Sequence, residues 1–331
     1  MITIALDAMG GDYAPKEIVK GALLALDNPN INILLVGQPD AIQKELLIGG
    51  QTQQDRLTIM PATEVIEMGE SPANAVRKKK DSSICVGLRL VKEGKADAFV
   101  SAGNTGAVMT ASTIILGKIQ GVERPAIATV LPSDKGKLVA LDMGSNVDCR
   151  ASHLAQFALM GVAFSKLILG IDAPRVGLLN IGEEPEKGNA VTLEAYELIK
   201  KLPIQFIGNI ESKYILSGKA DVIVCDGFVG NMLIKFGEGV FSLFFNYLKQ
   251  EFKNSFLSKI GLTFLTPALK RFKKRFDYEE VGGAPLLGVN GVSIIAHGVS
   301  NAIAIKHAIE TAEQAIQNRI VEYIAKEIQC P

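Results

Sequence analysis

Short runs of apolar residues alternate with helix-like patterns along most of the chain, which predicts an α/β protein. The runs contain few polar positions, as expected for strands whose two faces are both covered by helices. We therefore expect an α/β/α doubly wound sandwich with a parallel sheet. The predicted strands span residues 2–6, 31–36, 57–60, 98–101, 127–131, 138–141, 176–180, 204–207, 222–225 and 292–295.

Five of these runs are followed by polar turns rich in Gly, Asn and Asp. A strand, a small-residue turn and a helix together direct backbone N–H groups and the positive end of the helix dipole at one point. Ligands of such sheets bind outside the carboxyl ends of the strands. The five turns therefore predict one shared polar crevice that binds an anion. They are D-A-M-G-G-D (7–12), S-A-G-N-T-G (101–106), D-M-G-S-N-V-D (142–148), N-I-G-E-E-P-E-K-G-N (180–189) and D-G-F-V-G-N (226–231).

Length and charge narrow the class of protein. The 331 residues predict a single catalytic α/β unit built from two interleaved lobes, because no Pro-rich linker or repeat divides the chain. Lys plus Arg and Asp plus Glu both number 35, so no net charge favours nucleic acid as a partner. Four scattered cysteines and a strand-like start without a signal segment favour a cytoplasmic protein with buried thiols.

The region 235–278 departs from the alternating pattern. It holds eleven of the twenty aromatic residues, interleaved with Lys and Arg, and its uncharged centre at 260–268 contains Pro267. This pattern predicts a protruding amphipathic helical hairpin with an apolar tip. Basic flanks around an apolar tip suit an anionic membrane surface. A helical dimer interface would use the same residues, and both readings can hold together.

Signatures of a protein nucleophile are missing from the chain. It has no G-x-S-x-G elbow, no G-x-x-x-x-G-K-[ST] loop and no H-x-x-x-x-D pattern. His153 and His307 fall in helical patterns and are expected at the surface or an interface, whereas His297 follows a strand and is a candidate catalytic residue. Cys225, at a strand end, is expected to be a buried structural thiol. No cluster has metal-ligand spacing, so we expect neither a metal nor a cofactor.

An anion site without a protein nucleophile fits a substrate that is itself an anionic nucleophile, such as phosphate. The five turns, with V-G-L-L-N-I-G at 176–182 and K-G-N at 187–189, closely resemble the bacterial phosphate acyltransferase family, PlsX. The resemblance runs in order from residue 2 to about residue 322.

This resemblance implies that an acyl group on acyl carrier protein is transferred to inorganic phosphate, giving acyl phosphate and free carrier protein for phospholipid synthesis. It also implies an isocitrate-dehydrogenase-like fold and a homodimer. It further implies peripheral association with the inner face of the cell membrane, where a glycerol-phosphate acyltransferase takes the product.

A direct attack of phosphate on the thioester is the expected mechanism, because phosphate needs only positioning and a stabilised oxyanion. Lys187 is the candidate for neutralising the charge, and Asp12 and Asp148 are expected to orient donors. Each of these Asn and Asp residues could equally serve as a turn residue or as a helix N-cap. The further catalytic candidates are Asn146, Asn189, Asn231 and His297. The substrate-binding candidates are Asp7, Gly10, Gly11, Asp12, Ser101, Gly103, Asn104, Thr105, Asp148, Asp226 and Gly227.

Three alternatives remain open at the level of the sequence. The basic run R-K-K-K at 77–80 would receive the acidic carrier protein, assist phosphate or form a solvated face. A hydroxy-acid dehydrogenase of the same fold would need a nicotinamide fingerprint or a metal-binding carboxylate cluster, and the chain shows neither. A non-catalytic membrane scaffold would not need five polar loops.

Overall fold

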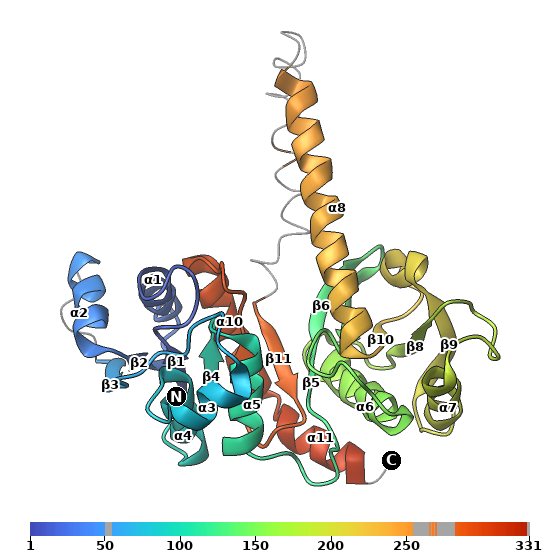
Figure 1. Ribbon diagram of the computed structural model, residues 1–331, viewed down its shortest axis with the longest axis horizontal. Helices are drawn as coiled ribbons and strands as arrows, with labels where there is room; N and C mark the ends of the chain where they lie inside the picture. The colour runs from blue at the N-terminus through green and yellow to red at the C-terminus, as the bar shows by residue number, and fades with distance from the viewer. Residues whose placement is uncertain (50–54, 254–264, 266, 268, 270–281, 330–331) are drawn as a thin grey trace.

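Two separate sheets form the core of the molecule, which confirms the mixed α/β class (Figure 1). The computed structural model describes residues 1–49, 55–253, 265, 267, 269 and 282–329. The seven-stranded sheet has the order β3-β2-β1-β4-β12-β11-β5, and the five-stranded sheet has the order β6-β7-β10-β8-β9. The expectation of one doubly wound sheet is thus corrected to two sheets that are both rich in parallel pairs.

The seven-stranded sheet is parallel except at β11, which runs antiparallel to both of its neighbours. Ile4 and Leu6 of β1 pack in the hydrophobic cluster that contains α1 and α10, whereas Ala5 packs in the cluster that contains α4 and α5. Alternate residues thus face helices on opposite sides. The strands are β1 (Ile2–Asp7), β2 (Ile31–Gly37), β3 (Leu57–Pro61), β4 (Ala98–Ser101), β5 (Ala126–Ile127), β11 (Ala284–Leu287) and β12 (Val292–Ile295). The helices are α1 (Lys16–Ala25), α2 (Pro39–Ile48), α3 (Pro72–Lys78), α4 (Ser83–Lys92), α5 (Thr105–Ile115), α10 (Ala302–Gln317) and α11 (Ile320–Gln329).

The five-stranded sheet is parallel except at β6, which pairs antiparallel with β7. Phe157 of α6 and Ala195 of α7 lie in one hydrophobic cluster with Val139 of β7, and Ile215 of η1 lies in the other cluster with Leu138. Both faces of this sheet are therefore also covered. Its strands are β6 (Thr129–Ser133), β7 (Gly136–Leu141), β8 (Arg175–Asn180), β9 (Gln205–Glu211) and β10 (Val222–Val224). Its helices are α6 (Ala151–Leu167), α7 (Ala190–Ile199) and the 3₁₀ helix η1 (Ser212–Ser217).

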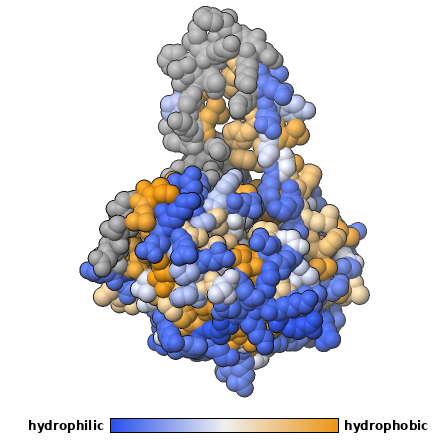
Figure 2. Space-filling model, turned by 60° about the vertical axis from the view of Figure 1, so that its left-hand side comes forward, coloured by the Kyte–Doolittle hydropathy of each residue, from blue (hydrophilic) through white to orange (hydrophobic). Residues whose placement is uncertain are grey.

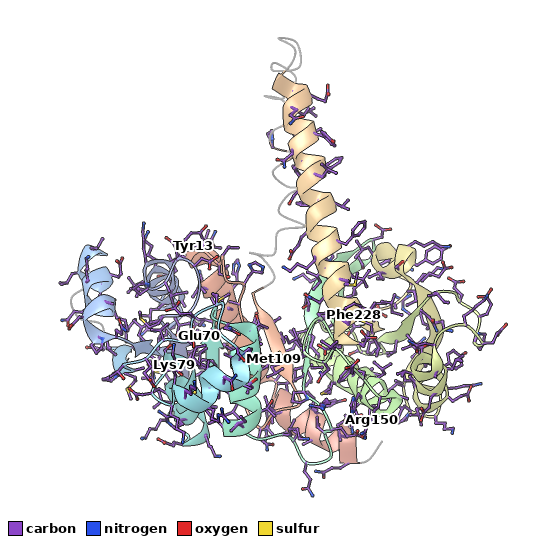
Figure 3. The ribbon with its side chains drawn as sticks, viewed as in Figure 1. Tyr13, Glu70, Lys79, Met109, Arg150 and Phe228 are labelled. Carbon is purple, nitrogen blue, oxygen red and sulfur yellow. The ribbon has the colours of Figure 1, made fainter. Side chains whose placement is uncertain are left out.

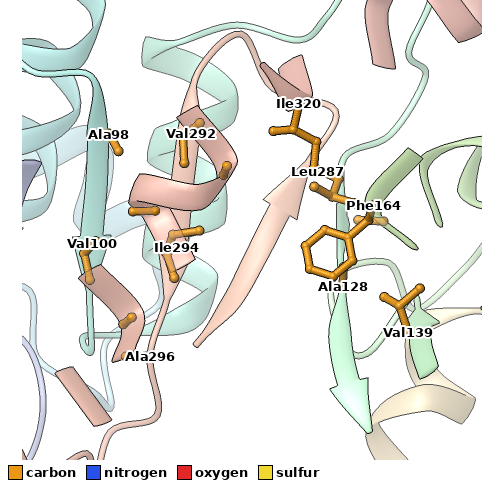
Figure 4. Packing of buried hydrophobic residues seen from close by; sticks show 14 of the residues in the cluster. Ala98, Val100, Ala128, Val139, Phe164, Leu287, Val292, Ile294, Ala296 and Ile320 are labelled. Atoms are coloured by element: carbon orange, nitrogen blue, oxygen red, sulfur yellow. The ribbon is translucent and has the colours of Figure 1, made fainter. Parts of the chain in front are cut away.

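The chain passes from the first sheet to the second at Ala128. The sequence predicts one strand at 127–131, and the structure divides this run between β5 and β6, with Ala128 in neither. Each half pairs with a different partner, β5 with β11 and β6 with β7. Phe164 of α6 and Leu287 of β11 belong with Ala128 to one hydrophobic cluster, which joins the two sheets at this crossing (Figure 4).

Helix α8 (Gly227–Lys253) extends away from both sheets (Figure 1). It begins eight residues before the predicted hairpin and includes residues 227–231 of the turn that the sequence predicts after β10. Among the described residues it is the one helix that is long and apolar enough to cross a membrane, by length and composition alone. In its most apolar stretch of 18 residues, 6% of the residues are buried. The rest of the predicted hairpin, apart from residues 265, 267 and 269, lies outside the described residues.

Candidate active site

The first group of polar residues lies where the neighbouring strands β1 and β4 end. Asp7, which is 1% exposed, accepts a hydrogen bond at Oδ2 from Ser101 Oγ (2.7 Å) and one at Oδ1 from the Met9 N–H (3.1 Å). The Gly103 N–H donates to the same Ser101 hydroxyl at 3.0 Å. Burial raises the pKa of Asp7, while hydrogen bonds from Ser83 and Ser101 lower it. The two turns are therefore joined by buried bonds through Asp7 and Ser101.

Gly10 and Gly11 let these two turns approach each other closely. A Cβ on Gly10 would lie 2.4 Å from Asp7 Oδ2 and 2.6 Å from the Gly103 nitrogen. Gly11 has a φ of 104°, a backbone conformation that side chains with a Cβ rarely adopt. The turn at 7–12 therefore requires glycine at both positions.

Asn104 is the N-cap of α5, and its side chain is committed to protein partners. Its Oδ1 accepts from the Ala107 N–H at 3.0 Å. Its amide nitrogen donates to the carbonyls of Met68 (2.9 Å), Glu70 (3.1 Å) and Glu67 (3.3 Å). Asn104 thus holds the Glu67 loop, residues 67–70, against the start of α5. Thr105, the first residue of that helix, is exposed beside it.

The basic run at 77–80 contributes to the same loop through one residue. Lys79 Nζ donates to the Val65 carbonyl at 2.7 Å and forms an ion pair with Glu70, which lowers the pKa of Glu70 (Figure 3). Arg77, Lys78 and Lys80 are exposed. Lys79 therefore braces the Glu67 loop, and its three neighbours form the solvated part of the run.

Asp12 and His297 lie at the rim of the first group. The Asp12 N–H donates to the Gly298 carbonyl at 2.7 Å, which joins the turn after β1 to the turn after β12. His297 Nδ1 accepts from the Val299 N–H at 3.4 Å. Both side chains are exposed, so they are accessible from solvent at this edge of the sheet.

The second group follows β7 and is organised by Asp142, which is fully buried. Its Oδ1 accepts from the N–H of Ser145 (3.0 Å), of Gly144 (3.3 Å) and of Ile127 (3.2 Å), and from the Ser145 hydroxyl. Its Oδ2 accepts from the backbone N–H (2.7 Å) and the side-chain amide (2.9 Å) of Asn146. Asp142 plays the same part here as Asp7 does in the first group, because it fixes the turn that contains it.

The side-chain amide of Asn146 donates its hydrogen bonds to other parts of the protein. Besides Asp142, its Nδ2 donates to the Pro125 carbonyl at 2.7 Å. Its own carbonyl accepts from the Gly227 N–H at 2.8 Å, and a Cβ on Gly227 would lie 2.8 Å from Asp142 Oδ2. Asp226 accepts from the Val229 N–H at 2.8 Å and so caps the start of α8. These contacts place the first turn of α8 directly against the Asp142 turn.

Asn231 and Asp148 remain exposed beside this packed centre. Asn231 is one turn along α8, and its Cβ lies 3.6 Å from where a Cβ on Gly144 would be. Phe228, at the base of the same helix, is 55% exposed (Figure 3). Asn231 therefore presents its side chain to solvent next to the turn.

Cys149 and Cys225 lie behind the same turn. Burial raises the pKa of the Cys149 thiol to about 12, with the charges of Asp142 and Asp226 adding to the effect. Burial also raises the pKa of Cys225, which is 4% exposed. The expectation of a structural thiol at Cys225 agrees with this burial, because a thiol held protonated is a poor nucleophile.

Lys187 belongs to the loop between β8 and α7. The side chain is exposed, and its Cγ lies 3.0 Å from where a Cβ on Gly182 would be, so it folds back over Gly182, the second residue after the strand. Asn189 caps α7, because its Oδ1 accepts from the Thr192 N–H at 2.9 Å. β7, β10 and β8 are neighbours in the sheet, so the loops at 142–148 and 180–189 and the start of α8 follow adjacent strands. The sequence predicts a turn at 226–231, but the structure has residues 227–231 in α8.

The predicted site residues thus form two groups, one at each sheet, where the sequence predicts one crevice. The second group reaches the first sheet through β5, since the Met143 N–H donates to the Ile127 carbonyl at 3.1 Å. Sequence reasoning named Asp7 as a site residue but not Asp142, although both directly follow an apolar run. It also missed the Glu67 loop, which carries no motif.

His153 is expected at the surface or an interface, but the structure buries it within the chain. His153 is 6% exposed, in the first turn of α6, where its Nε2 lies 3.1 Å from Glu123 Oε2. His307 is partly exposed on α10. Across the part of the chain that the structure describes, His, Cys, Asp and Glu side chains form no group of three that could hold a metal.

Comparison with known proteins places the chain in a family. Residues 2–323 match the model of a family described as fatty acid synthesis protein. Phosphate acyltransferase of Pelotomaculum thermopropionicum is 54% identical over 326 residues, covering 98% of this chain and 95% of the relative. Phosphate acyltransferase of Heliobacterium modesticaldum is 54% identical over 325 residues, covering 98% and 97%. A solved phosphotransacetylase from Streptococcus pyogenes shares the fold at 19% identity, with a TM-score of 0.62 over 99% of this chain and 94% of that one. The chain therefore belongs to the phosphate acyltransferase family of fatty acid synthesis proteins.

Proposed function

We propose that the protein transfers the acyl group of a long-chain acyl carrier protein thioester to inorganic phosphate. An oxygen of hydrogen phosphate forms a bond to the thioester carbonyl carbon and the C–S bond breaks. The carrier protein leaves as a thiolate, which takes up the proton that the phosphate loses. The product is an acyl phosphate, which a glycerol-phosphate acyltransferase would consume in phospholipid synthesis. The carrier protein and phosphate are the substrates that the family assignment supports.

The buried bonds among Asp7, Ser101 and Gly103 are the observation that carries this proposal. They fix two glycine-rich turns beside the N-terminus of α5, where the positive end of the helix dipole favours an anion. A free carboxylate would repel phosphate. Asp7 does not do so, because it is buried and its oxygens accept from the Ser101 hydroxyl and the Met9 N–H. The first group is therefore suited to a small dianion.

In this proposal the second group receives the thioester. Lys187 stabilises the negative charge that develops on the carbonyl oxygen, and Asn231 donates a hydrogen bond to it. Asn146 acts indirectly, because its side-chain amide already donates to the Asp142 carboxylate and to the Pro125 carbonyl. Phosphate itself is the nucleophile, so the protein supplies positioning and charge rather than a covalent intermediate.

A pair of glycine variants tests the site. Gly10→Ala would force a Cβ against Asp7 and Gly103, and we expect it to lower phosphate-dependent release of free carrier protein by about 100-fold. Gly237→Ala, on α8 and outside both groups, is the matched control, because a Cβ there meets no atom within 4 Å. Wild-type turnover in a folded Gly10→Ala protein would refute the site.

A second variant tests the role of Lys187. Lys187→Ala should lower kcat by about 100-fold, because the ammonium group stabilises the developing charge. A loss confined to carrier-protein binding would show that Lys187 does not act on the reacting carbonyl.

The proposal also includes a homodimer attached peripherally to the inner face of the cytoplasmic membrane, in an isocitrate-dehydrogenase-like arrangement. The apolar side chains on α8 support an attachment surface, since Phe236 is 73% exposed and Tyr247 is 61% exposed. Apolar and hydrophilic side chains lie side by side on the protruding part of the molecule (Figure 2). Such a helix suits either a lipid surface or a second copy of the chain.

A further inference from the structure

Two buried or half-buried amides hold the loop that carries Lys187. Asn180, the last residue of β8, donates from Nδ2 to the Lys187 carbonyl (2.9 Å) and to Asn209 Oδ1 (3.1 Å). Asn209, which is 6% exposed in β9, donates from its own Nδ2 to the Glu184 carbonyl at 2.7 Å. The Lys187 loop, residues 181–188, is thus tied at two carbonyls to two side chains that hydrogen-bond to each other.

An irregularity in β9 accompanies this placement of Asn209. Val176 of β8 pairs with Phe206, but Leu178 pairs with Asn209, so β9 has one extra residue between the two pairs. Gly208 takes up that extra residue with a φ of 90°. Because side chains alternate along a strand, one extra residue redirects every side chain that follows, and bulges of this kind are frequent beside active sites.

Glycine at position 188 allows the Lys187 carbonyl to reach Asn180. Gly188 has a φ of 120°. A Cβ there would lie 2.8 Å from Nδ2 and from Oδ1 of Asn180, and 2.1 Å from Thr192 Oγ1. On its outer side the loop is held by Glu183, which forms an ion pair with Lys219 at 2.8 Å. The backbone of the loop is therefore fixed on both sides, and Lys187 is its exposed cation.

We propose that Asn209, acting through Asn180, is a positioning residue that sets where the Lys187 ammonium group lies at the end of β8. The inference rests on the proposed function, in which that group stabilises the developing oxyanion. Asn209 itself is covered by the loop and reaches Lys187 only through backbone carbonyls. A displacement of about 1 Å in a charge-stabilising group is enough to lower a rate about 100-fold.

The test combines Asn209→Ala with Lys187→Ala in a double-mutant cycle. We expect Asn209→Ala alone to lower kcat by about 10- to 100-fold, with the KM for phosphate changed less than about twofold because the first group is untouched. In the Lys187→Ala background, adding Asn209→Ala should cost less than about twofold more, because both changes remove the same contribution. Amide exchange of residues 182–188 should become faster in Asn209→Ala.

Asn290→Ala is the matched control. Its amide also ties a distant loop, donating to the Lys118 carbonyl at 2.8 Å, yet it lies away from both groups, and we expect unchanged kcat. If Asn209→Ala does not fold, Asn209→Ser keeps a donor in the buried position and replaces it in the cycle. Melting temperatures establish which variants are folded.

The outcomes separate the two hypotheses. If the wild type releases no carrier protein with phosphate, the proposed function fails and this inference falls with it. If the wild type is active and Lys187→Ala is equally active, the role of Lys187 is wrong and Asn209 has nothing to position. If Asn209→Ala costs the same factor with and without Lys187→Ala, Asn209 has a merely structural role and the inference is overturned.

Discussion

Ser101 Oγ donates a buried hydrogen bond of 2.7 Å to Asp7 Oδ2, across 94 positions of the chain. The bond joins the ends of the neighbouring strands β4 and β1. Because the same hydroxyl accepts from the Gly103 N–H at 3.0 Å, one side chain sets the position of both turns. The geometry of the first group therefore depends on a single serine.

Removing that hydroxyl should separate catalysis from stability. Ser101→Ala and Ser112→Ala each remove one buried hydroxyl, since Ser112 Oγ lies 3.0 Å from Ser293 Oγ. We expect each variant to lower the free energy of unfolding by about 1 kcal/mol, measured with urea. Only Ser101→Ala should also raise the KM for phosphate, by about tenfold. Equal kinetics in the two variants would contradict the assignment of the first group to phosphate.

The part played by Asn104 can be tested with its nearest isostere. Asn104→Asp keeps an acceptor for the Ala107 N–H but loses the donor to three carbonyls of the Glu67 loop. We expect faster amide exchange in residues 67–70 with α5 unchanged, measured by mass spectrometry. Asn318→Asp, which loses a bond to the Gln314 carbonyl, is the control. Unaltered exchange at 67–70 would show that other contacts hold this loop.

His153 should make stability depend on pH below neutrality. Burial lowers the pKa of His153 below its usual 6.5, although Glu123 opposes the shift. Its Nδ1 accepts from the Arg150 N–H at 3.1 Å, which requires that nitrogen to be unprotonated. The unfolded chain then binds the proton more readily, so the stability that His153 contributes is complete above pH 6.5 and is lost as the pH falls toward the folded value.

Thermal melts at about pH 7, 6 and 5 measure this dependence across the ordinary histidine range. We expect the melting temperature of His153→Gln to fall less on acidification than that of the wild type. Asn318→Gln changes an exposed side chain that does not titrate, and it should leave the dependence as it is in the wild type. Identical slopes for His153→Gln and the wild type would assign the acid sensitivity to other groups.

A charge on α8 should distinguish a lipid surface from a subunit interface. We expect the double variant Phe236→Glu with Phe244→Glu to lose binding to anionic phosphatidylglycerol vesicles, because both rings are more than half exposed and a buried charge opposes insertion. Asn246→Glu places the same charge on the same helix at an already polar position and should still bind. Co-sedimentation measures binding, and sedimentation velocity measures the oligomer. Vesicle binding by a monomeric double variant would identify the surface as an interface.

Continuous apolar runs predicted the central strands well. β4 and β12 match the predicted bounds, because each is fully buried and each is followed by a polar turn. β11 was missed, since Pro285 interrupts its apolar pattern. The division of the run at Ala128 was also missed, because a change of partner sheet leaves no trace in local hydropathy.

Residue types at strand ends could be predicted, but not which of their atoms are free. Asn104 and Asn189 both proved to be N-caps, an alternative that the sequence alone left open. Asn146 is committed to the Asp142 carboxylate and the Pro125 carbonyl, a contact 21 positions away. Such commitments depend on tertiary contacts, which neither spacing nor composition encodes.

The strand order of the first sheet has a consequence for the protein as it leaves the ribosome. β4 lies between β1 and β12, yet roughly 190 residues separate the end of β4 from the start of β12. At about 5–20 residues per second, β4 waits roughly 10–40 s for its second neighbour. During that interval the edge of β4 is open to pairing with other chains. A synthesis slowed between β4 and β12 should therefore increase the demand for chaperones, whatever the stability of the finished molecule.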